Sequence, residues 1–359
     1  MDLSELGWDF LFEEAYQQYK HRGLIPAKVG REDRGMYLLL SADGELAGEV
    51  SGRFRHEAVS KHDYPAVGDW VVADVLPQEQ KATIQAVLPR KSSFVRKVAG
   101  GRTEGQVVAA NVDVTFIVCG LDGGRNFNLR RTERYLTLAR ESETDPVLLL
   151  NKADLCPDVE TCVQQAESVA AGVPIHTVSA LKGTGLERIR EHLGPGRSAV
   201  LLGPSGVGKS ALINALLGEK RQTVNTQRKG DLQGRHTTTR RELVVLPDGG
   251  IVIDTPGMRE LQMWGDEETV AQAFTDIEEL AEQCRFRDCK HQGEPGCAVQ
   301  DAVNQGILDA ARFDSYLRLQ REMAYVASRQ DQRARNEAEL KWKNIRKWTR
   351  QYYKERGHK

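Results

Sequence analysis

One short stretch of the chain has the residue types and spacing of a phosphate-binding loop. The strand-like run 199–202 leads into G-P-S-G-V-G-K-S, and a helical run follows. Glycines let backbone N–H groups turn inward around phosphates, and the helix N-terminus adds positive dipole character. Lys209 would reach the β- and γ-phosphates in catalysis, and the Ser210 hydroxyl would ligate Mg²⁺. The residues expected to hold the nucleotide here are Gly203, Pro204, Ser205, Gly206, Val207, Gly208, Lys209, Ser210 and Ala211.

A motif upstream of this loop has the pattern that reads guanine. The strand-like run 146–150 ends in N-K-A-D at residues 151–154. The Asp154 carboxylate can accept hydrogen bonds from two adjacent N–H donors on guanine, which adenine does not offer. Losing a paired polar contact in a closed pocket costs ~1–3 kcal/mol, so one aspartate discriminates strongly. Asn151 and Lys152 would brace the loop and pack on the base.

Two further motifs complete the nucleotide site. Ser179 and Ala180 resemble the S-A loop that touches guanine O6 through a backbone N–H. Downstream of the phosphate loop, the apolar run 251–253 leads into D-T-P-G, which resembles the switch II motif of GTPases. Asp254 would hold Mg²⁺, mostly through water, and the N–H of Gly257 would sense the γ-phosphate.

The segment G-R-H-T-T-T at 234–239 lies where a switch I loop is expected. Thr238 is the candidate for a hydroxyl ligand that reaches Mg²⁺ only when GTP is bound. The residue after the switch II motif is Met258, which cannot orient water as the glutamine of Ras-like enzymes does. Unaided hydrolysis should therefore be slow, and either a partner or another side chain would complete the site. His236 is the candidate side chain; the alternative is that it merely packs in a mobile loop.

The order of these motifs is unusual, because both base-reading motifs precede the phosphate loop. Most GTPases begin with the phosphate loop. A parallel sheet tolerates the rearrangement if the old chain ends lie close together, since each strand–loop unit keeps its place. Alternating strand and helix patterns from residue 101 onward indicate a doubly wound α/β domain. The sequence thus predicts a circularly permuted GTPase domain over 101–282.

A cluster of three cysteines and one histidine follows this domain. In a cytosolic chain such spacing indicates a metal site rather than disulfides. Three thiolates and an imidazole form a closed tetrahedral Zn²⁺ site, which leaves no position for a catalytic water. We therefore expect one structural zinc ion. Its expected ligands are Cys284, Cys289, His291 and Cys297.

The remaining segments form the expected frame of the molecule. Residues 1–34 read as a helical extension that packs on a neighbour, 35–100 as an all-β barrel of OB type, and 283–359 as an α-rich zinc domain with a basic tail. The barrel has a basic bias, which indicates either a solvated surface or an RNA-binding face. Its basic residues are Arg53, Arg55, Lys61, Arg90, Lys91, Arg96 and Lys97.

Composition bounds the possible partners. The 359 residues have a net charge of −1, so affinity for nucleic acid must come from local patches. The last 19 residues are one such patch, with eight Lys or Arg and one Glu. No apolar run reaches the ~20 residues that cross a bilayer, and the N-terminus does not have the pattern of a secretory signal. We expect a cytoplasmic protein, and nothing requires more than a monomer.

Together, these motifs resemble the small-subunit-dependent GTPases, circularly permuted enzymes of bacterial ribosome biogenesis. The resemblance covers roughly residues 35–320 and depends on the permuted order followed directly by the Cys₃His cluster. It implies an N-terminal OB barrel, a central GTPase and a C-terminal zinc domain. It also implies binding to the small ribosomal subunit and its rRNA late in maturation, with GTP hydrolysis stimulated by that subunit and linked to release.

Two other functions are compatible with the sequence. The chain could be an RNA-binding scaffold that uses guanine nucleotide only as a structural ligand. It could also be a GTPase that acts on another RNA or on a membrane process, although no transmembrane or lipidation signal supports a membrane role. Turnover stimulated by ribosomal subunits would exclude the scaffold.

Overall fold

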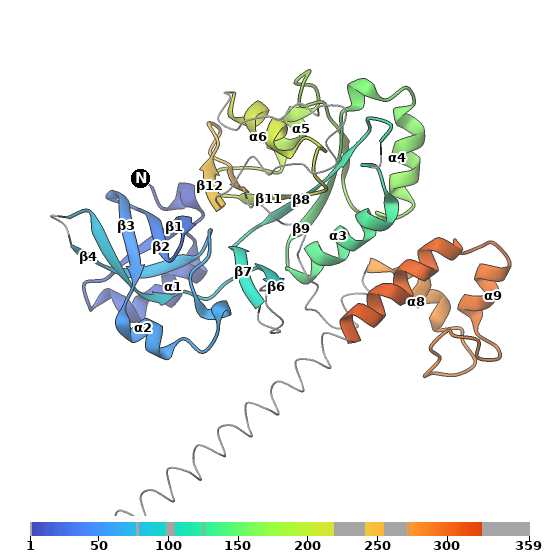
Figure 1. Cartoon of the computed structure of the whole chain (residues 1–359), viewed down its shortest axis with the longest axis horizontal. Helices are drawn as coiled ribbons and strands as arrows, with labels where there is room; N and C mark the ends of the chain where they lie inside the picture. Colours follow the sequence, from blue (N-terminus) through green and yellow to red (C-terminus); the bar gives the residue numbers. More distant parts are fainter. Residues whose placement is uncertain are drawn as a thin grey trace, which may run out of the picture. The chain divides into compact units, whose positions relative to one another are not determined.

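The computed structural model describes residues 2–76, 79–97, 105–124, 126–218, 241–254, 271 and 273–324. The chain divides into two compact units, Met1–Gln262 and Met263–Lys359 (Figure 1). The first unit contains a β-barrel and an α/β domain, and the second contains the Cys/His cluster.

The N-terminal segment packs onto the barrel, as expected. A short 3₁₀ helix, η1 (Ser4–Leu6), precedes α1 (Phe10–Lys20). Asp9 caps α1 by accepting hydrogen bonds from the first-turn N–H groups. The Trp8 ring stacks on Phe12 of α1 at 5.9 Å and meets the buried Trp70 of the barrel edge-on at 4.7 Å. These aromatic contacts fix the helix to the barrel wall.

Five strands close into a barrel of OB type. Around the ring, β1 pairs with β2, β2 with β3, β3 with β5 in parallel, β5 with β4, and β4 with β1. The helices α2 (Gly52–Glu57) and η2 (Lys61–Asp63) lie between β3 and β4. The strands are β1 (Ile25–Asp33), β2 (Met36–Ser41), β3 (Gly44–Val50), β4 (Trp70–Leu76) and β5 (Lys81–Val87).

The first barrel strand differs from the expected helical extension over 1–34. Helix α1 ends at Lys20, and the chain then runs as β1, which pairs with two other strands. The reason is burial on the inner face, where Ala27 and Val29 are fully enclosed. Only residues before about 25 form the helical extension. Strand β1, which the sequence reading assigned to that extension, belongs to the barrel.

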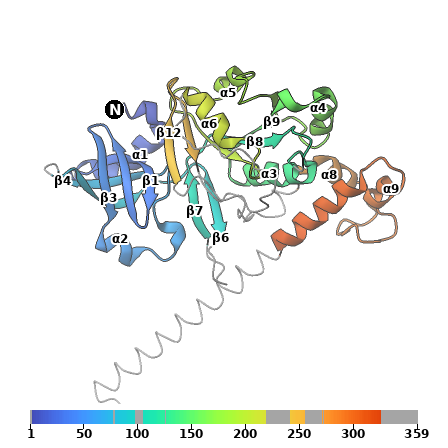
Figure 2. The same ribbon diagram turned by 45° about the horizontal axis from the view of Figure 1, so that its top comes forward.

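The sheet of the α/β domain is hydrogen-bonded to the barrel. Strand β12 (Arg241–Val245) pairs with the end of β1, where Arg241 lies opposite Glu32 and forms an ion pair of 3.3 Å with it. A separate hairpin, β6 (Ser93–Lys97) and β7 (Gly105–Ala110), connects the two parts along the chain (Figure 2). The strand that follows the expected switch I segment is therefore also the strand that touches the barrel.

The α/β domain has the sheet order β10-β9-β8-β11-β13-β12, in which all neighbours are parallel except β12. Its strands are β8 (Val114–Gly120), β9 (Asp145–Asn151), β10 (Ile175–Thr177), β11 (Ser198–Leu202), β12 and β13 (Ile251–Asp254). Its helices are α3 (Leu129–Glu141), η3 (Ala153–Leu155), α4 (Val159–Glu167), α5 (Leu186–Glu191) and α6 (Lys209–Leu217).

Alternating side chains of the buried strands pack on opposite faces of this sheet. Phe116 and Val118 of β8 belong to the core that also holds residues of α5 and α6, which lie together in Figure 1. Cys119, between the other face and α3, meets the Thr132 hydroxyl at 3.3 Å. Strands buried on both faces read as near-continuous apolar runs, which is why the sequence predicted them closely.

The described part of the second unit is helical. Helices α8 (Thr275–Ala281) and α9 (Ala298–Asn304) pack with the helical residues 310–324. Phe274 meets Tyr316 at 5.6 Å, and Arg312 makes a bidentate ion pair with Asp276 at 2.6 Å. Because α8 shares this core, the unit begins before the expected boundary at residue 283. None of the helices in the described part of the chain combines the length and apolar character that a bilayer crossing requires.

Candidate functional site

The expected nucleotide motifs meet at one edge of the sheet. Strands β9, β10, β11 and β13 belong to its parallel part, so their carboxyl ends lie along the same edge. Ligands of open α/β sheets bind outside these ends. The permuted chain order therefore leaves the spatial order of the motifs intact.

Asn151 joins three of the motifs. This residue is buried at the end of β9, and its Nδ2 donates to the Val207 carbonyl of the phosphate loop at 2.8 Å. Its Oδ1 accepts from the Ala180 backbone N–H at 3.1 Å. One amide side chain thus fixes the distance between the base-reading loops and the phosphate loop, as its donor and acceptor groups allow.

Asp154 and Ser179 also come together. The Ser179 hydroxyl donates to Oδ1 of Asp154 at 2.5 Å and accepts from the Lys182 N–H at 3.1 Å. The Ala153 N–H donates to the Val178 carbonyl at 3.1 Å, which holds the two loops in register. The sequence placed both residues at the site, and the structure adds that the serine side chain orients the aspartate.

The phosphate loop needs glycine at two close approaches. Gly203 has φ +154°, and a Cβ there would lie 2.5 Å from the Val118 carbonyl oxygen. Gly208 has φ +101°, and a Cβ would lie 2.3 Å from Nδ2 of Asn151. Both approaches exclude a larger residue. Of the loop, Val207 is buried, whereas Ser205 and Gly206 are exposed.

Lys209 begins α6 and turns back over the loop. Its Nζ donates to the carbonyl oxygens of Gly203 and Pro204 at 2.7 and 2.9 Å. Ser210 and Ala211 follow it in the first turn of the helix. The ammonium group is therefore placed on the loop that would hold the phosphates.

Sequence reasoning missed Asp122, which lies beside the base-reading motif. Its Oδ2 forms an ion pair with Nζ of Lys152 at 2.5 Å. Burial acts to raise the pKa of the Asp122 carboxyl, but the Lys152 ammonium, together with the backbone N–H groups of Asp122 and Gly124, outweighs burial and the pKa is lowered. The one sequence signal was an acidic residue just after a buried strand, at the ligand-binding edge of the sheet.

Several expected residues lie outside the described part of the chain. Asp254 is described and ends β13, at the same edge as the other motifs. Gly257 and Met258 after it are not described, nor is the whole segment 234–239 with His236 and Thr238. The basic tail from residue 341 onward is likewise outside.

The barrel's basic residues divide into structural and exposed ones. Arg90 is only 13 % exposed and contacts both oxygens of the fully buried Asp69 at 2.8 Å. It also donates to two backbone carbonyls, so it is not available to RNA. Lys91 pairs with Asp9 and helps to hold the N-terminal helix. Arg53 and Arg55 are exposed, each beside a glutamate.

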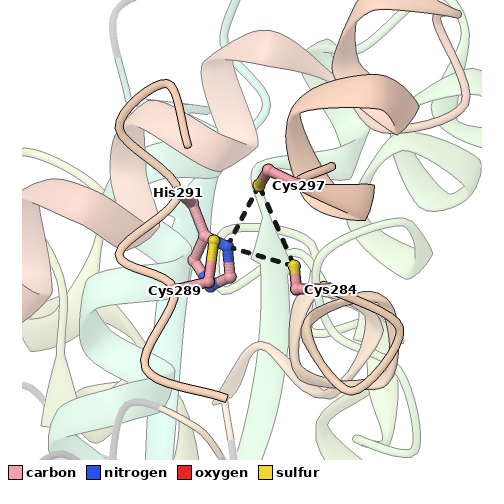
Figure 3. Close-up of side chains that lie close together, drawn as sticks. All are labelled: Cys284, Cys289, His291 and Cys297. Atoms are coloured by element: carbon pink, nitrogen blue, oxygen red, sulfur yellow. Dashed lines mark hydrogen bonds between the residues drawn. The ribbon is translucent and has the colours of Figure 1, made fainter. Parts of the chain in front are cut away.

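The Cys/His cluster is assembled in the second unit (Figure 3). The ligand atoms of Cys284, Cys289, His291 and Cys297 all lie within 4.8 Å of one another. Nδ1 of His291 is 3.6 Å from Sγ of Cys284 and 3.3 Å from Sγ of Cys297, and these two sulfurs are 3.9 Å apart. The sequence predicted all four residues as one group.

The distances among Cys284, His291 and Cys297 fit a tetrahedral zinc ion. Zn–S bonds of about 2.3 Å and Zn–N bonds of about 2.0 Å place neighbouring sulfurs about 3.8 Å apart, and sulfur and nitrogen about 3.5 Å apart. Burial lowers the pKa of His291, although Glu278 and Glu294 oppose this, which favours the neutral imidazole that binds metal. Burial, with the Cys297 and Cys284 thiols, raises the pKa of Cys289 to about 11, although the backbone N–H of His291 opposes this; a bound zinc ion would hold the thiolate form.

Comparison with known proteins agrees with this arrangement. The family model of the RsgA GTPases matches residues 87–264. The small ribosomal subunit biogenesis GTPase RsgA of Opitutus terrae is 46 % identical over 354 residues, covering 96 % of both chains. The chain belongs to the RsgA GTPase family. A relative of the same name from Streptomyces coelicolor is 43 % identical and covers 95 % of this chain and 92 % of its own.

Solved structures share the architecture. YjeQ from Thermotoga maritima is 28 % identical, with a TM-score of 0.62 over 84 % of this chain and 99 % of that one. YloQ, described as a circularly permuted GTPase, has a TM-score of 0.60 at 24 % identity, over 84 % of this chain and 95 % of that one. The permuted fold predicted from the motif order is confirmed. As in any GTPase of this family, Mg²⁺ is the expected companion of GTP.

Proposed function

We propose that the strand-edge site binds GTP with Mg²⁺ through the residues that the motifs assign. Asp154, oriented by Ser179, reads the guanine N–H groups, and the Ala180 N–H contacts O6. Asn151 keeps these loops at a fixed distance from the phosphate loop. The short distances among Asn151, Ala180 and Val207 support this assignment. When bound, Mg²⁺ neutralises phosphate charge, and Ser210, Thr238 and Asp254 are its proposed protein contacts.

Hydrolysis in this proposal needs help from outside the base and phosphate motifs. Lys209 stabilises the charge that develops on the β- and γ-phosphates. Met258 stands where a water-orienting glutamine would serve, so the free protein turns over slowly. His236 is the proposed residue that orients the attacking water when the partner is bound, and Gly257 senses the γ-phosphate.

The proposed partner is the maturing small ribosomal subunit. The observation that carries this is the 46 % identity, over nearly the whole chain, to a GTPase named for small-subunit biogenesis. The exposed Arg53 and Arg55 of the barrel, and the basic tail, supply positive charge for rRNA phosphates. Hydrolysis would release the chain from the subunit. We propose a cytoplasmic monomer that has no membrane role.

In the same proposal, the second unit holds one structural zinc ion through its Cys₃His cluster. The sulfur–sulfur and sulfur–nitrogen distances support zinc over a disulfide, because they match the edges of a tetrahedral site. The metal compensates for a core too small to be stable alone. Its role is to keep α8, α9 and the residues between them in a single arrangement.

Binding to purified ribosomal subunits tests the proposed partner. With a non-hydrolysable GTP analogue, the full chain should co-sediment with small subunits at least about tenfold more tightly than with large subunits, a difference of ~1.4 kcal/mol. Because both subunits are coated with phosphate, charge alone cannot give this preference.

Transfer RNA and free mRNA serve as competitors in that experiment. Equal retention on both subunits, or displacement by transfer RNA at similar concentrations, would contradict the small-subunit assignment. Binding to small subunits that does not depend on which nucleotide is present would instead favour an RNA-binding scaffold that uses guanine nucleotide only structurally.

A further inference from the structure

Asp122 and Lys152 face each other because of how β8 and β9 end. Gly120 is paired with Asn151 in the parallel ladder, and the Leu121 N–H donates to the Asn151 carbonyl at 2.8 Å. Lys152 is the first residue after β9 and Asp122 is the second after β8, so the two side chains start from neighbouring strand ends. The carboxylate and the ammonium meet at 2.5 Å, next to the loop that carries Asp154.

This ion pair differs from the surface pairs of the same domain. The side chains of Lys152 and Asp122 are 23 and 16 % exposed, whereas those of Arg188 and Glu191 are 60 and 55 % exposed. Partly buried pairs are screened less by water and salt, and they hold their geometry better. Lys152 also has a left-handed backbone, with φ +63°, which costs energy in a residue other than glycine.

The environment of the carboxylate supports a functional use for the pair. Oδ1 of Asp122 is buried and makes no hydrogen bond of good geometry within the described residues, although the backbone N–H groups of Asp122 and Gly124 help to lower the pKa of the carboxyl. Desolvating a partly buried ion pair costs free energy, which apolar groups of similar size would avoid. Nor is the pair needed to join the strand ends, because the bond from Leu121 to Asn151 already does so.

We infer that Asp122 is a positioning residue for guanine nucleotide, which acts by holding the Lys152 ammonium so that the lysine stem is presented to the base. A lysine side chain has large rotamer entropy, and fixing it on binding is unfavourable. Asp122 fixes it beforehand, so the nucleotide meets an ordered loop. This inference rests on the proposed role of residues 151–154 in reading guanine.

Nucleotide affinity in single and double variants tests the inference. Asp122→Asn keeps the size of the side chain and removes its charge, and it should weaken GDP binding about five- to tenfold in titration calorimetry. Lys152→Met keeps the stem and removes the ammonium. If Asp122 acts through Lys152, adding Asp122→Asn to Lys152→Met should cause no further loss.

Base discrimination separates positioning from a general loosening of the loop. IDP lacks the 2-amino group that Asp154 is proposed to bind, so the ratio of the IDP and GDP dissociation constants reports on Asp154. Asp122→Asn should leave this ratio unchanged, whereas Asp154→Asn should bring it close to one. A ratio that falls in Asp122→Asn would mean that the variant disorders the loop and would overturn the inference.

The matched control is Asp248→Asn, which removes the carboxylate from an exposed 2.7 Å ion pair with Arg190, outside the nucleotide motifs. If Asp122→Asn bound GDP as tightly as this control does, the inference would be overturned. It would also be overturned if Asp122→Asn reduced GDP affinity as much in the Lys152→Met background as in the wild type. If the wild-type chain does not prefer GDP to ADP, the proposed base-reading site itself is wrong, and that result is distinct from failure of Asp122 alone.

Discussion

Replacing Lys209 with alanine should slow multiple-turnover GTP hydrolysis at least about a hundredfold. Losses of this size are seen in other enzymes when a group that stabilises the charge of the transition state is removed. The Lys209 ammonium lies 2.7 and 2.9 Å from two carbonyl oxygens of the phosphate loop, beside the proposed position of the phosphates. Its loss leaves the charge between β- and γ-phosphates uncompensated. The measurement is phosphate release at saturating GTP, with and without small subunits.

Lys81→Ala is the matched control for that variant. Lys81 is an exposed lysine of the barrel in an ion pair of 2.8 Å with Glu79, and its loss should leave turnover unchanged. The melting temperature of each variant without nucleotide shows whether the chain still folds. A folded Lys209→Ala protein with the turnover number of the wild type would contradict the assignment of the phosphate loop.

The second large effect is expected in the metal cluster. Cys289→Ala should reduce bound zinc from about one ion per chain to none and unfold the second unit, because structural zinc sites contribute on the order of 10 kcal/mol to folding. The zinc content of the purified protein, measured by mass spectrometry, and limited proteolysis report these two changes. GDP affinity should change little, since the nucleotide motifs all belong to the first unit.

Cys162→Ala provides the comparison for the metal cluster. Cys162 is a half-buried thiol on α4, outside the cluster, and its removal should leave both zinc content and proteolysis unchanged. Cys289→Ala protein that retains one zinc ion per chain would show that the ligand set is wrong. A zinc-free variant that resists proteolysis like the wild type would show that the metal does not hold the unit together.

Sequence reasoning worked best where chemistry restricts the residue types. The phosphate loop, the N-K-A-D motif and the Cys₃His cluster each need particular side chains at fixed spacing, so their spatial groups could be predicted. The OB-type barrel was predicted from short strands and turn residues. The permuted order was predictable because a parallel sheet gathers its carboxyl strand ends whatever the chain order.

The features that were missed depend on contacts between distant residues. Nothing local distinguishes Arg90 from a surface arginine, because its partner Asp69 is 21 positions away. Strand β1 has a proline at Pro26, which weakens a strand prediction, yet its neighbours are buried in the barrel. Asp122 is one acidic residue in a glycine-containing loop, and the pairing of the ends of β8 and β9 places it opposite Lys152.

The position of the boundary between the two units could not be predicted for a similar reason. Helix α8 follows the GTPase motifs in the sequence and has no motif of its own. Its buried Phe274 and Ile277 assign it to the core of the second unit, through packing against residues such as Tyr316. Apolar residues at helical spacing show that a face is buried but not which partner covers it.

The most direct test of the account is the rate of GTP hydrolysis by the purified chain alone, and with small subunits, large subunits or whole ribosomes. Since Met258 leaves the free site without a water-orienting group, we predict a slow basal rate that rises by about a hundredfold or more with small subunits, as when partners complete other GTPase sites. Large subunits should give no comparable increase. Equal slow rates in all four conditions would contradict the account.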